Sequence, residues 1–142
     1  MSSLEEVNKS LVTRYIEEIW YRKRIDVLDD FLAPNYKRYL SPLTEPLSLG
    51  GQKQRLAGFL TAFPDVQLKV EDLVADGDRV AFRSTMQGTH QGVFQGLQPT
   101  GKKFSVFLVD VIRVENGRFA EHWGGPDLLD LLKQLGAVLS TK

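Results

Sequence analysis

The sequence predicts an α+β fold in which helices pack on one face of an antiparallel sheet. Three observations lead to this prediction. The chain has 142 residues, the usual size of one domain, so we treat residues 1–142 as a single domain. Apolar residues recur at helical spacing before Pro64, and they alternate with polar residues, as in strands, after it. Short turn signals separate the strands, which favours antiparallel hairpins over parallel crossovers.

Three helices are predicted in the first half of the chain. Apolar residues spaced three and four positions apart mark them, over residues 4–20, 27–32 and 56–63. Ser3 followed by Glu6 is typical of a capping box at the start of the first helix. The second and third helices end before Pro34 and Pro64, because the residue preceding a proline disfavours helical geometry. The segment after Pro34, rich in proline and serine, is predicted to be a loop.

Strands and one final helix are predicted in the second half. The strands cover residues 66–71, 79–88, 104–114 and 118–123. Asp76-Gly77-Asp78 and Asn116-Gly117 are turn signals, each lying directly before a strand. The last helix is predicted to begin at Gly125-Pro126 and to end at Gly136, the residue type that commonly follows a helix.

The composition excludes several classes of function. Basic and acidic residues balance at 18 each, and Lys and Arg form only short groups, so we expect no nucleic-acid partner. The chain has no cysteine, which excludes a thiol nucleophile and a zinc–thiolate site. The two histidines lie far apart with no carboxylate at metal-ligand spacing, and no nucleotide-binding fingerprint occurs. We therefore expect neither a metal nor a cofactor.

The sequence shows no sign of export or of membrane insertion. The N-terminus is acidic where a signal peptide would be basic. The longest wholly apolar run covers residues 106–109, far short of the roughly 18 residues that a membrane span needs. A cytoplasmic protein without a membrane partner is therefore expected.

The strand predicted over residues 104–114 is apolar on both faces. Antiparallel sheets normally leave one face in water, so something is expected to cover the second. We expect this cover to be a second copy of the chain, in a homodimer formed through the outer sheet face. The alternative is that the C-terminal helix or a loop covers it.

Asp110 is the one charged residue on the face of this strand that also carries Phe104. It shares its face with Val106, Leu108 and Ile112, so its carboxyl group is predicted to point into apolar space. A carboxyl group in an apolar cavity is suited to general acid or base catalysis, and a structural aspartate bonded to an arginine or to backbone amides is the alternative. Arg83 either pairs with Asp110 inside the cavity or is an ordinary surface charge, and the sequence leaves both open.

The last strand carries two further candidates. Glu121 and Trp123 share one face, which we place inside, with the acid as a second proton-transfer group and the indole as a flat wall. His122 then lies on the outer side. His90, between two strands, is either a donor at the rim of the cavity or a residue without a role. Five aromatic residues of the helical half are candidates for contact with a planar ligand, although aromatics at helical spacing more often form core: Tyr15, Trp20, Tyr36, Tyr39 and Phe59.

Several short motifs, taken in order, carry a family resemblance. They are Ala62-Phe63-Pro64-Asp65, residues 71–81, Gly88-Thr89-His90-Gln91-Gly92, Pro99-Thr100-Gly101-Lys102, residues 110–117, Glu121-His122-Trp123, Asp127-Leu128-Leu129 and Gln134-Leu135-Gly136. Together they resemble the SnoaL-like polyketide cyclase, or predicted ester cyclase, family over nearly the whole chain. The resemblance implies a cone-shaped α+β barrel, in which N-terminal helices close a curved sheet around an apolar pocket, and it implies dimers. Two positions differ, because family members often have a histidine at Tyr39 and an acidic residue at Gly124.

The resemblance also implies an activity. Characterised members of the family close a ring of an aromatic polyketide by an intramolecular aldol reaction, with an acid/base carboxylate and no cofactor. It makes Asp110 the best-matched polar position of the pocket, with Glu121 and Trp123 lining it. Our first hypothesis takes Asp110 as the acid/base group and adds Tyr39 and Arg83 as hydrogen-bond donors. The substrate would be a small apolar or aromatic molecule. A non-catalytic binding protein for such a molecule, an isomerase or dehydratase on the same fold, and a dimeric interaction module are the alternatives.

Overall fold

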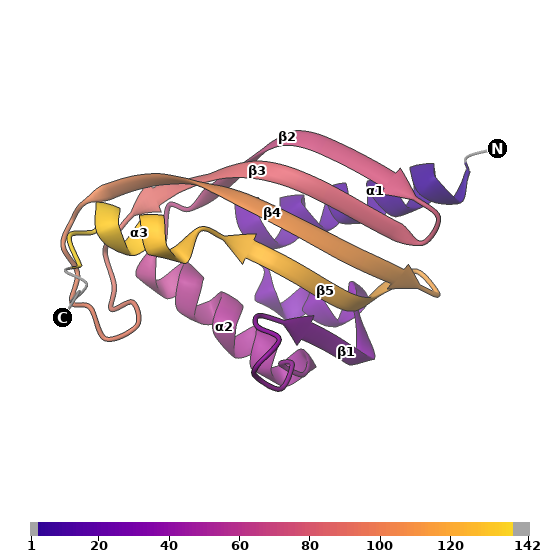
Figure 1. Cartoon of the computed structure of the whole chain (residues 1–142), viewed down its shortest axis with the longest axis horizontal. Helices are drawn as coiled ribbons and strands as arrows, with labels where there is room; N and C mark the ends of the chain where they lie inside the picture. Colours follow the sequence, from indigo (N-terminus) through magenta and orange to yellow (C-terminus); the bar gives the residue numbers. More distant parts are fainter. Residues whose placement is uncertain (1–2, 138–142) are drawn as a thin grey trace.

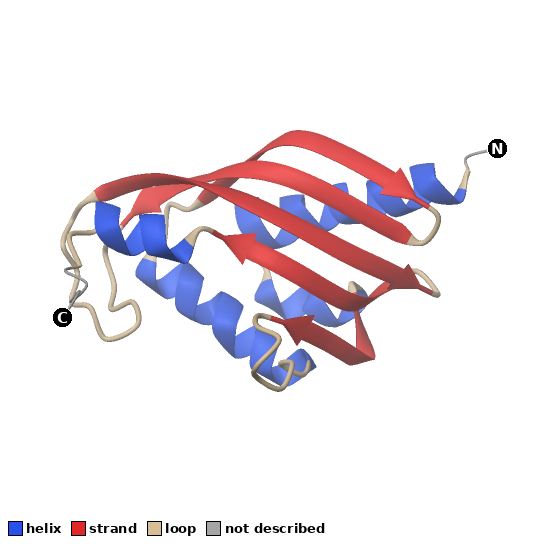
Figure 2. Cartoon of the chain, in the orientation of Figure 1, coloured by secondary structure: helices blue, strands red, loops and turns tan. Residues whose placement is uncertain are grey.

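A curved five-stranded sheet with helices against its inner face forms the fold (Figures 1 and 2). The computed structural model describes residues 3–137. The helical elements are α1 (Leu4–Tyr15), a π-helical segment η1 (Ile16–Tyr21), a 3₁₀ segment η2 (Ile25–Asp30), α2 (Leu49–Ala62) and α3 (Leu128–Gln134). The strands are β1 (Leu32–Tyr39), β2 (Gln67–Asp76), β3 (Arg79–Thr89), β4 (Lys103–Glu115) and β5 (Arg118–Pro126). No helix in this part of the chain is long and apolar enough to cross a membrane.

The strand order is β1-β5-β4-β3-β2. The pairs β2–β3, β3–β4 and β4–β5 are antiparallel, as the turn signals predict. The predicted α+β class is therefore confirmed. One edge strand differs, because β1 lies parallel to β5 and reaches the sheet from the helical half of the chain.

The first helix begins where the sequence predicts, whereas α2 begins seven residues before its predicted start at residue 56. Ser3 Oγ accepts a hydrogen bond from the backbone N–H of Glu6 at 3.1 Å, which confirms the N-terminal cap of α1. Asp127 caps α3 in the same way through the N–H of Asp130, so Gly125-Pro126 belongs to β5 and the helix begins later than predicted. Gly136 follows α3 with a positive φ of 86°, as expected at a helix end.

The prediction of a loop after Pro34 is wrong, because β1 covers Leu32–Tyr39. A proline removes one backbone donor, and a sheet tolerates that loss at an edge strand. The helix predicted over residues 27–32 is instead the 3₁₀ segment η2, which covers Ile25–Asp30 and ends before this strand begins.

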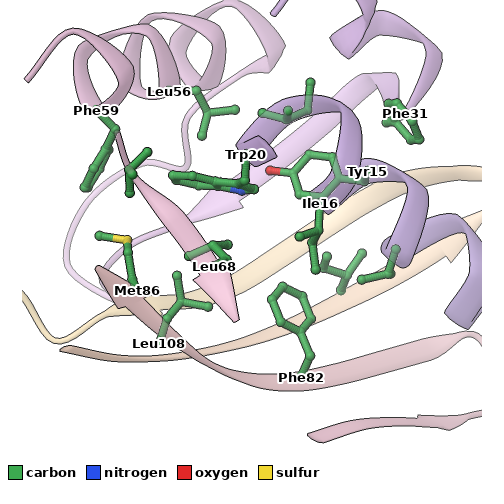
Figure 3. Close-up of a cluster of buried hydrophobic side chains, with 14 of the residues drawn as sticks. Tyr15, Ile16, Trp20, Phe31, Leu56, Phe59, Leu68, Phe82, Met86 and Leu108 are labelled. Carbon is green, nitrogen blue, oxygen red and sulfur yellow. The ribbon is translucent and has the colours of Figure 1, made fainter. Parts of the chain in front are cut away.

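The core lies between the inner sheet face and the helices (Figure 3). Tyr15 and Trp20, from α1 and η1, face Phe82 and Leu108 of the sheet. On the outer face, Phe107 and Val109 of β4 are 66% and 51% exposed, so nothing in residues 3–137 covers them fully. A partner subunit at this face remains a prediction.

A β-bulge in β5 changes which side chains face the core. Phe119 pairs with Val114 and Glu121 pairs with Arg113, so one extra residue, Ala120, stands between them. Phe119 and Ala120 are consequently both buried, and alternation resumes with His122 inside. The prediction that placed Glu121 and Trp123 inside and His122 outside is therefore wrong, because it assumed unbroken alternation.

Candidate active site

Four polar side chains meet on the inner face of the sheet. Asp110 comes from β4, His122 from β5, and Tyr36 and Arg38 from β1. These three strands are neighbours, which brings their inward positions together. Asp110, His122 and Arg38 are only 5%, 3% and 1% exposed. The inward position predicted for Asp110 is thus confirmed.

Arg38 is held mainly by backbone carbonyl groups. Its Nη2 donates to Gly124 O at 2.8 Å, and its Nη1 donates to Tyr39 O at 3.1 Å and His122 O at 3.3 Å. Its Nη2 is 3.7 Å from Asp110 Oδ1, an ion pair longer than a hydrogen bond. The guanidinium therefore neutralises part of the carboxylate charge without occupying the carboxylate oxygen.

His122 connects Tyr36 to Asp110. Its Nδ1 lies 2.9 Å from Tyr36 Oη, and its Nε2 lies 3.3 Å from Asp110 Oδ1. Burial raises the pKa of Tyr36 far above its ordinary value, so the phenol keeps its proton and donates a hydrogen bond to Nδ1 of His122. The imidazole proton then sits on Nε2, facing the carboxylate. Burial also lowers the pKa of His122, although Asp110 opposes this, so the ring is neutral at neutral pH.

The protein is expected to become less stable as the pH decreases, because His122 is buried in its neutral form. Its folded-state pKa lies below the usual value of 6.5, so the unfolded chain takes up the proton first. The free energy of unfolding should therefore decrease as the pH falls below about 6.5, by up to about 1.4 kcal/mol per pH unit. Denaturant titrations between about pH 5 and 7 measure this slope, before carboxylates titrate in the unfolded chain near pH 4.

The control is His122→Gln, which cannot take up a proton. Its free energy of unfolding should change less over the same pH range than that of the unsubstituted protein. Equal slopes for the two proteins would show that His122 is not the group responsible.

Two adjacent cavities, which share part of their lining, lie next to this cluster. The wide one, about 760 Å³, opens between α2, the loop before β4 and the end of β5. The inner one, about 10 Å³, is lined by Asp110, His122 and Arg38. Arg55 and Phe59 of α2 line both cavities, together with Gly125 and Pro126. We call the place where these four residues meet the neck.

The inner cavity is small, but several buried polar atoms line it. Four buried atoms in its lining have no hydrogen-bond partner in the described part of the chain: Asp110 Oδ1, His122 Nε2, Arg38 Nε and Gln52 Oε1. A cavity of about 10 Å³ has room for one oxygen atom the size of water. Buried polar groups without partners cost free energy, so this cavity favours a carbonyl or hydroxyl oxygen. Within residues 3–137, no three His, Asp or Glu side chains are placed to hold a metal ion.

Three of the predicted aromatic residues lie at these cavities. Tyr15 and Trp20 line the inner one, and Phe59 lines both. The hydroxyl group of Tyr15 points toward Trp20 (Figure 3). Burial, with a smaller contribution from Asp110, raises the pKa of Tyr15 to about 12, so this phenol keeps its proton at neutral pH.

Four other predicted residues lie on the outer face of the sheet and away from both cavities. Arg83 is exposed, and its Nε is 2.8 Å from Asp72 Oδ2, so the surface alternative is confirmed. Tyr39 Oη donates to Glu121 Oε2 at 2.9 Å, and the Tyr39 ring stacks on Trp123 with ring centres 5.4 Å apart. Catalytic or lining positions for Arg83, Tyr39, Glu121 and Trp123 do not agree with this geometry.

His90 is fully buried and lines neither cavity. Its Nδ1 lies 3.0 Å from Thr100 Oγ1, and its ring packs against Phe63. The prediction of a donor at the cavity rim is wrong, because this histidine joins the two ends of the loop that carries it.

Sequence reasoning missed Arg38, Gln52 and Arg55, and it named Tyr36 only as a possible contact for a planar ligand. Periodicity counts apolar residues, so a buried arginine interrupts the pattern that would mark its strand. Tyr36 and Arg38 do stand two residues apart, as inward residues of one strand must, but Lys37 and Tyr39 share the polar and aromatic character of their neighbours. The signal was therefore present but ambiguous.

Comparison with known proteins settles the family. A model of the SnoaL-like polyketide cyclases matches residues 10–135. The chain belongs to this family. It is 29% identical over 118 residues to the nogalonic acid methyl ester cyclase of Streptomyces nogalater, covering 80% of this chain and 86% of that protein. Cyclases among its relatives support a cyclase-type function for this SnoaL-like protein.

Solved structures of SnoaL-like relatives agree with the fold. TsrD from Streptomyces laurentii is 31% identical with a TM-score of 0.82, and the match covers 94% of this chain and 97% of TsrD. AclR, a proposed hydroxylase from Streptomyces galilaeus, is 33% identical with a TM-score of 0.82, covering 95% of this chain and 88% of AclR. Similar folds in this family thus carry different proposed activities.

Proposed function

We propose that the protein is a cofactor-independent cyclase that closes a ring in a polyketide-type substrate by an intramolecular aldol reaction. Asp110 takes a proton from a carbon next to a carbonyl group, which leaves an enolate. The enolate carbon attacks a second carbonyl carbon of the same molecule, and the resulting alkoxide takes the proton back. The carboxylate is regenerated, and no oxidant or reductant is consumed.

The observation that carries this proposal is the buried carboxylate with one unpaired oxygen beside a substrate-sized cavity. The two nearest donors to Asp110 Oδ1, at 3.3 and 3.7 Å, make no hydrogen bond of good geometry with it, so this oxygen keeps a lone pair for a carbon-bound proton. The N–H of His122 and the guanidinium of Arg38 lie within 3.3 and 3.7 Å of that oxygen. The same donors are close enough to stabilise negative charge on an enolate oxygen. The apolar body of the substrate would remain in the wide cavity while its reacting end enters through the neck.

The second candidate is a non-catalytic binding protein for an apolar small molecule. One observation favours it, because Asp110 lines the inner cavity of about 10 Å³ and does not line the wide one. In that case a ligand would fill the wide cavity without reaching the carboxylate.

An activity assay separates the two candidates. The purified protein is incubated in D₂O with nogalonic acid methyl ester, and the mixture is followed by liquid chromatography with mass detection. A cyclase gives a product whose retention changes while its mass shows only exchange of hydrogen for deuterium, because an aldol addition conserves atoms. Binding without ring closure or deuterium exchange at the carbon next to the carbonyl would overturn the proposal for this substrate and favour the binding protein. Aklanonic acid methyl ester, named in two shorter matches at 33% identity, is the second substrate for the same assay.

A further inference from the structure

Arg55 is the one charged side chain among the described residues that line the wide cavity. It projects from α2 into the neck, with its guanidinium 5.0 Å from the centre of the Phe59 ring. The rest of that lining is mainly apolar, with Leu40, Leu47, Phe59, Val93, Phe94 and Leu128 contributing side chains. A ligand body in this cavity would thus touch mostly apolar surface and meet one positive charge.

The inner cavity and the neck together carry more positive than negative charge. Arg38 and Arg55 are cationic, Asp110 supplies one negative charge, and His122 is neutral for the reasons given above. A Cβ atom on Gly125 would lie 3.2 Å from Arg38 Nη2 and 3.7 Å from Arg55 Nη2, so both guanidinium groups approach the same glycine. One carboxylate cannot neutralise both of them.

The guanidinium groups of the two arginines differ in their hydrogen-bond partners. Arg38 donates to three backbone carbonyl groups and lies in the inner cavity. Arg55 makes no hydrogen bond or ion pair with any residue in 3–137, although it is partly buried. Burial and the nearby charge of Arg38 lower the pKa of Arg55 to about 10, so it still carries its charge at neutral pH. A partly buried cation without a counter-ion is costly, and an anion in the cavity would offset that cost.

We propose that the wide cavity takes an apolar ligand that carries a free carboxylate, and that this carboxylate pairs with Arg55 at the neck. The inference rests on the proposed function, because it names the substrate class of the same cavity. A guanidinium can bind a carboxylate through two parallel N–H···O bonds, which an uncharged ester cannot match. The relatives matched above are named for methyl esters, so a free acid would distinguish this chain from them.

The bound group is a permanent carboxylate rather than the enolate formed in the reaction. The enolate oxygen must lie near Asp110, in the inner cavity where His122 and Arg38 already supply donors. Arg55 also faces the wide cavity, which Asp110 does not line. The charge of Arg55 is therefore placed to select the ligand before any proton moves.

The test is a pair of fluorescent probes that differ only in charge. Anthracene-2-carboxylate and its methyl ester are titrated with the protein, and binding is followed by fluorescence anisotropy. The acid is expected to bind about tenfold more tightly than the ester, because a hydrogen bond to a charged partner has about that effect. Arg55→Met and Arg55→Gln should each reduce the ratio to within about twofold, whereas Arg55→Lys should keep a preference for the acid.

The matched control is Arg83→Gln, which removes an arginine from the outer face and should leave the ratio unchanged. Equal affinities of the unsubstituted protein for acid and ester, or an unchanged ratio in both neutral Arg55 variants, would overturn the inference. Thermal unfolding of each variant verifies that it is folded. Neither probe has a carbon acid to react, so this result is independent of cyclase activity, and failure of the cyclase proposal would leave the measured preference intact.

Discussion

Asp110→Asn is expected to reduce the rate of ring closure by about 10³-fold, the typical contribution of a positioned acid or base. The amide has nearly the shape of the carboxylate but cannot accept a proton from carbon. Arg38 keeps its bonds to three backbone carbonyl groups in this variant, so the sheet around residue 110 should still form. The measurement is single-turnover product formation by chromatography, with a melting curve to verify folding.

Glu121→Gln is the matched control for this substitution. Glu121 is a carboxylate of the neighbouring strand, but it lies on the outer face and pairs with Arg113 Nε at 2.7 Å. A partly exposed ion pair contributes at most about 1 kcal/mol, so this variant should fold and should retain turnover within about twofold. Full activity of Asp110→Asn, or equal losses in the two variants, would contradict the role proposed for Asp110.

Gly124→Ala is expected to lower the free energy of unfolding by at least about 3 kcal/mol. Gly124 has a φ of +98°, and a Cβ atom there would lie 2.1 Å from Val109 O on the neighbouring strand. The clash is with a backbone atom, so it can be relieved only if β4 and β5 move apart. Denaturant titration of the free energy of unfolding measures the loss.

Gly77→Ala is the control, because Gly77 also has a positive φ but a Cβ there would meet nothing within 4 Å. That variant should lose only about 1 kcal/mol, the cost of a left-handed backbone for alanine. If both variants lost a similar free energy of unfolding, the contact with Val109 O would not be what excludes a side chain at position 124. The same contact explains why this chain cannot accommodate the acidic residue that the family resemblance places at this position.

Most of the fold follows from periodicity and turn chemistry. The cap at Ser3 and the hairpin turn at Asn116-Gly117 are local signals, and both appear in the structure where they are predicted. The strand β1 was missed because Pro34 suggests a break and because its inward residue Arg38 is charged. What buries Arg38 is a set of carbonyl groups from a strand distant in sequence, which no local pattern reveals.

The candidate site could be predicted only as far as strand alternation remained intact. Asp110 was placed correctly because β4 pairs with β3 without any irregularity along its length. His122 was placed on the wrong face because the bulge at Ala120 shifts the alternation by one residue, and an extra residue in a ladder leaves no clear mark in a single sequence. The neck was not predicted. Arg55 lies on α2, and which face of this helix lines the cavity depends on tertiary packing.

The edge position of β1 has a consequence for how the protein loses activity. Arg38 reaches across 84 residues of sequence to His122, and Tyr36 joins the same histidine, so one peripheral strand supplies half of the polar cluster. Edge segments detach from a sheet more easily than central ones. Local unfolding of β1 would remove Tyr36 and Arg38 from the candidate site together. The rest of the molecule would remain largely folded.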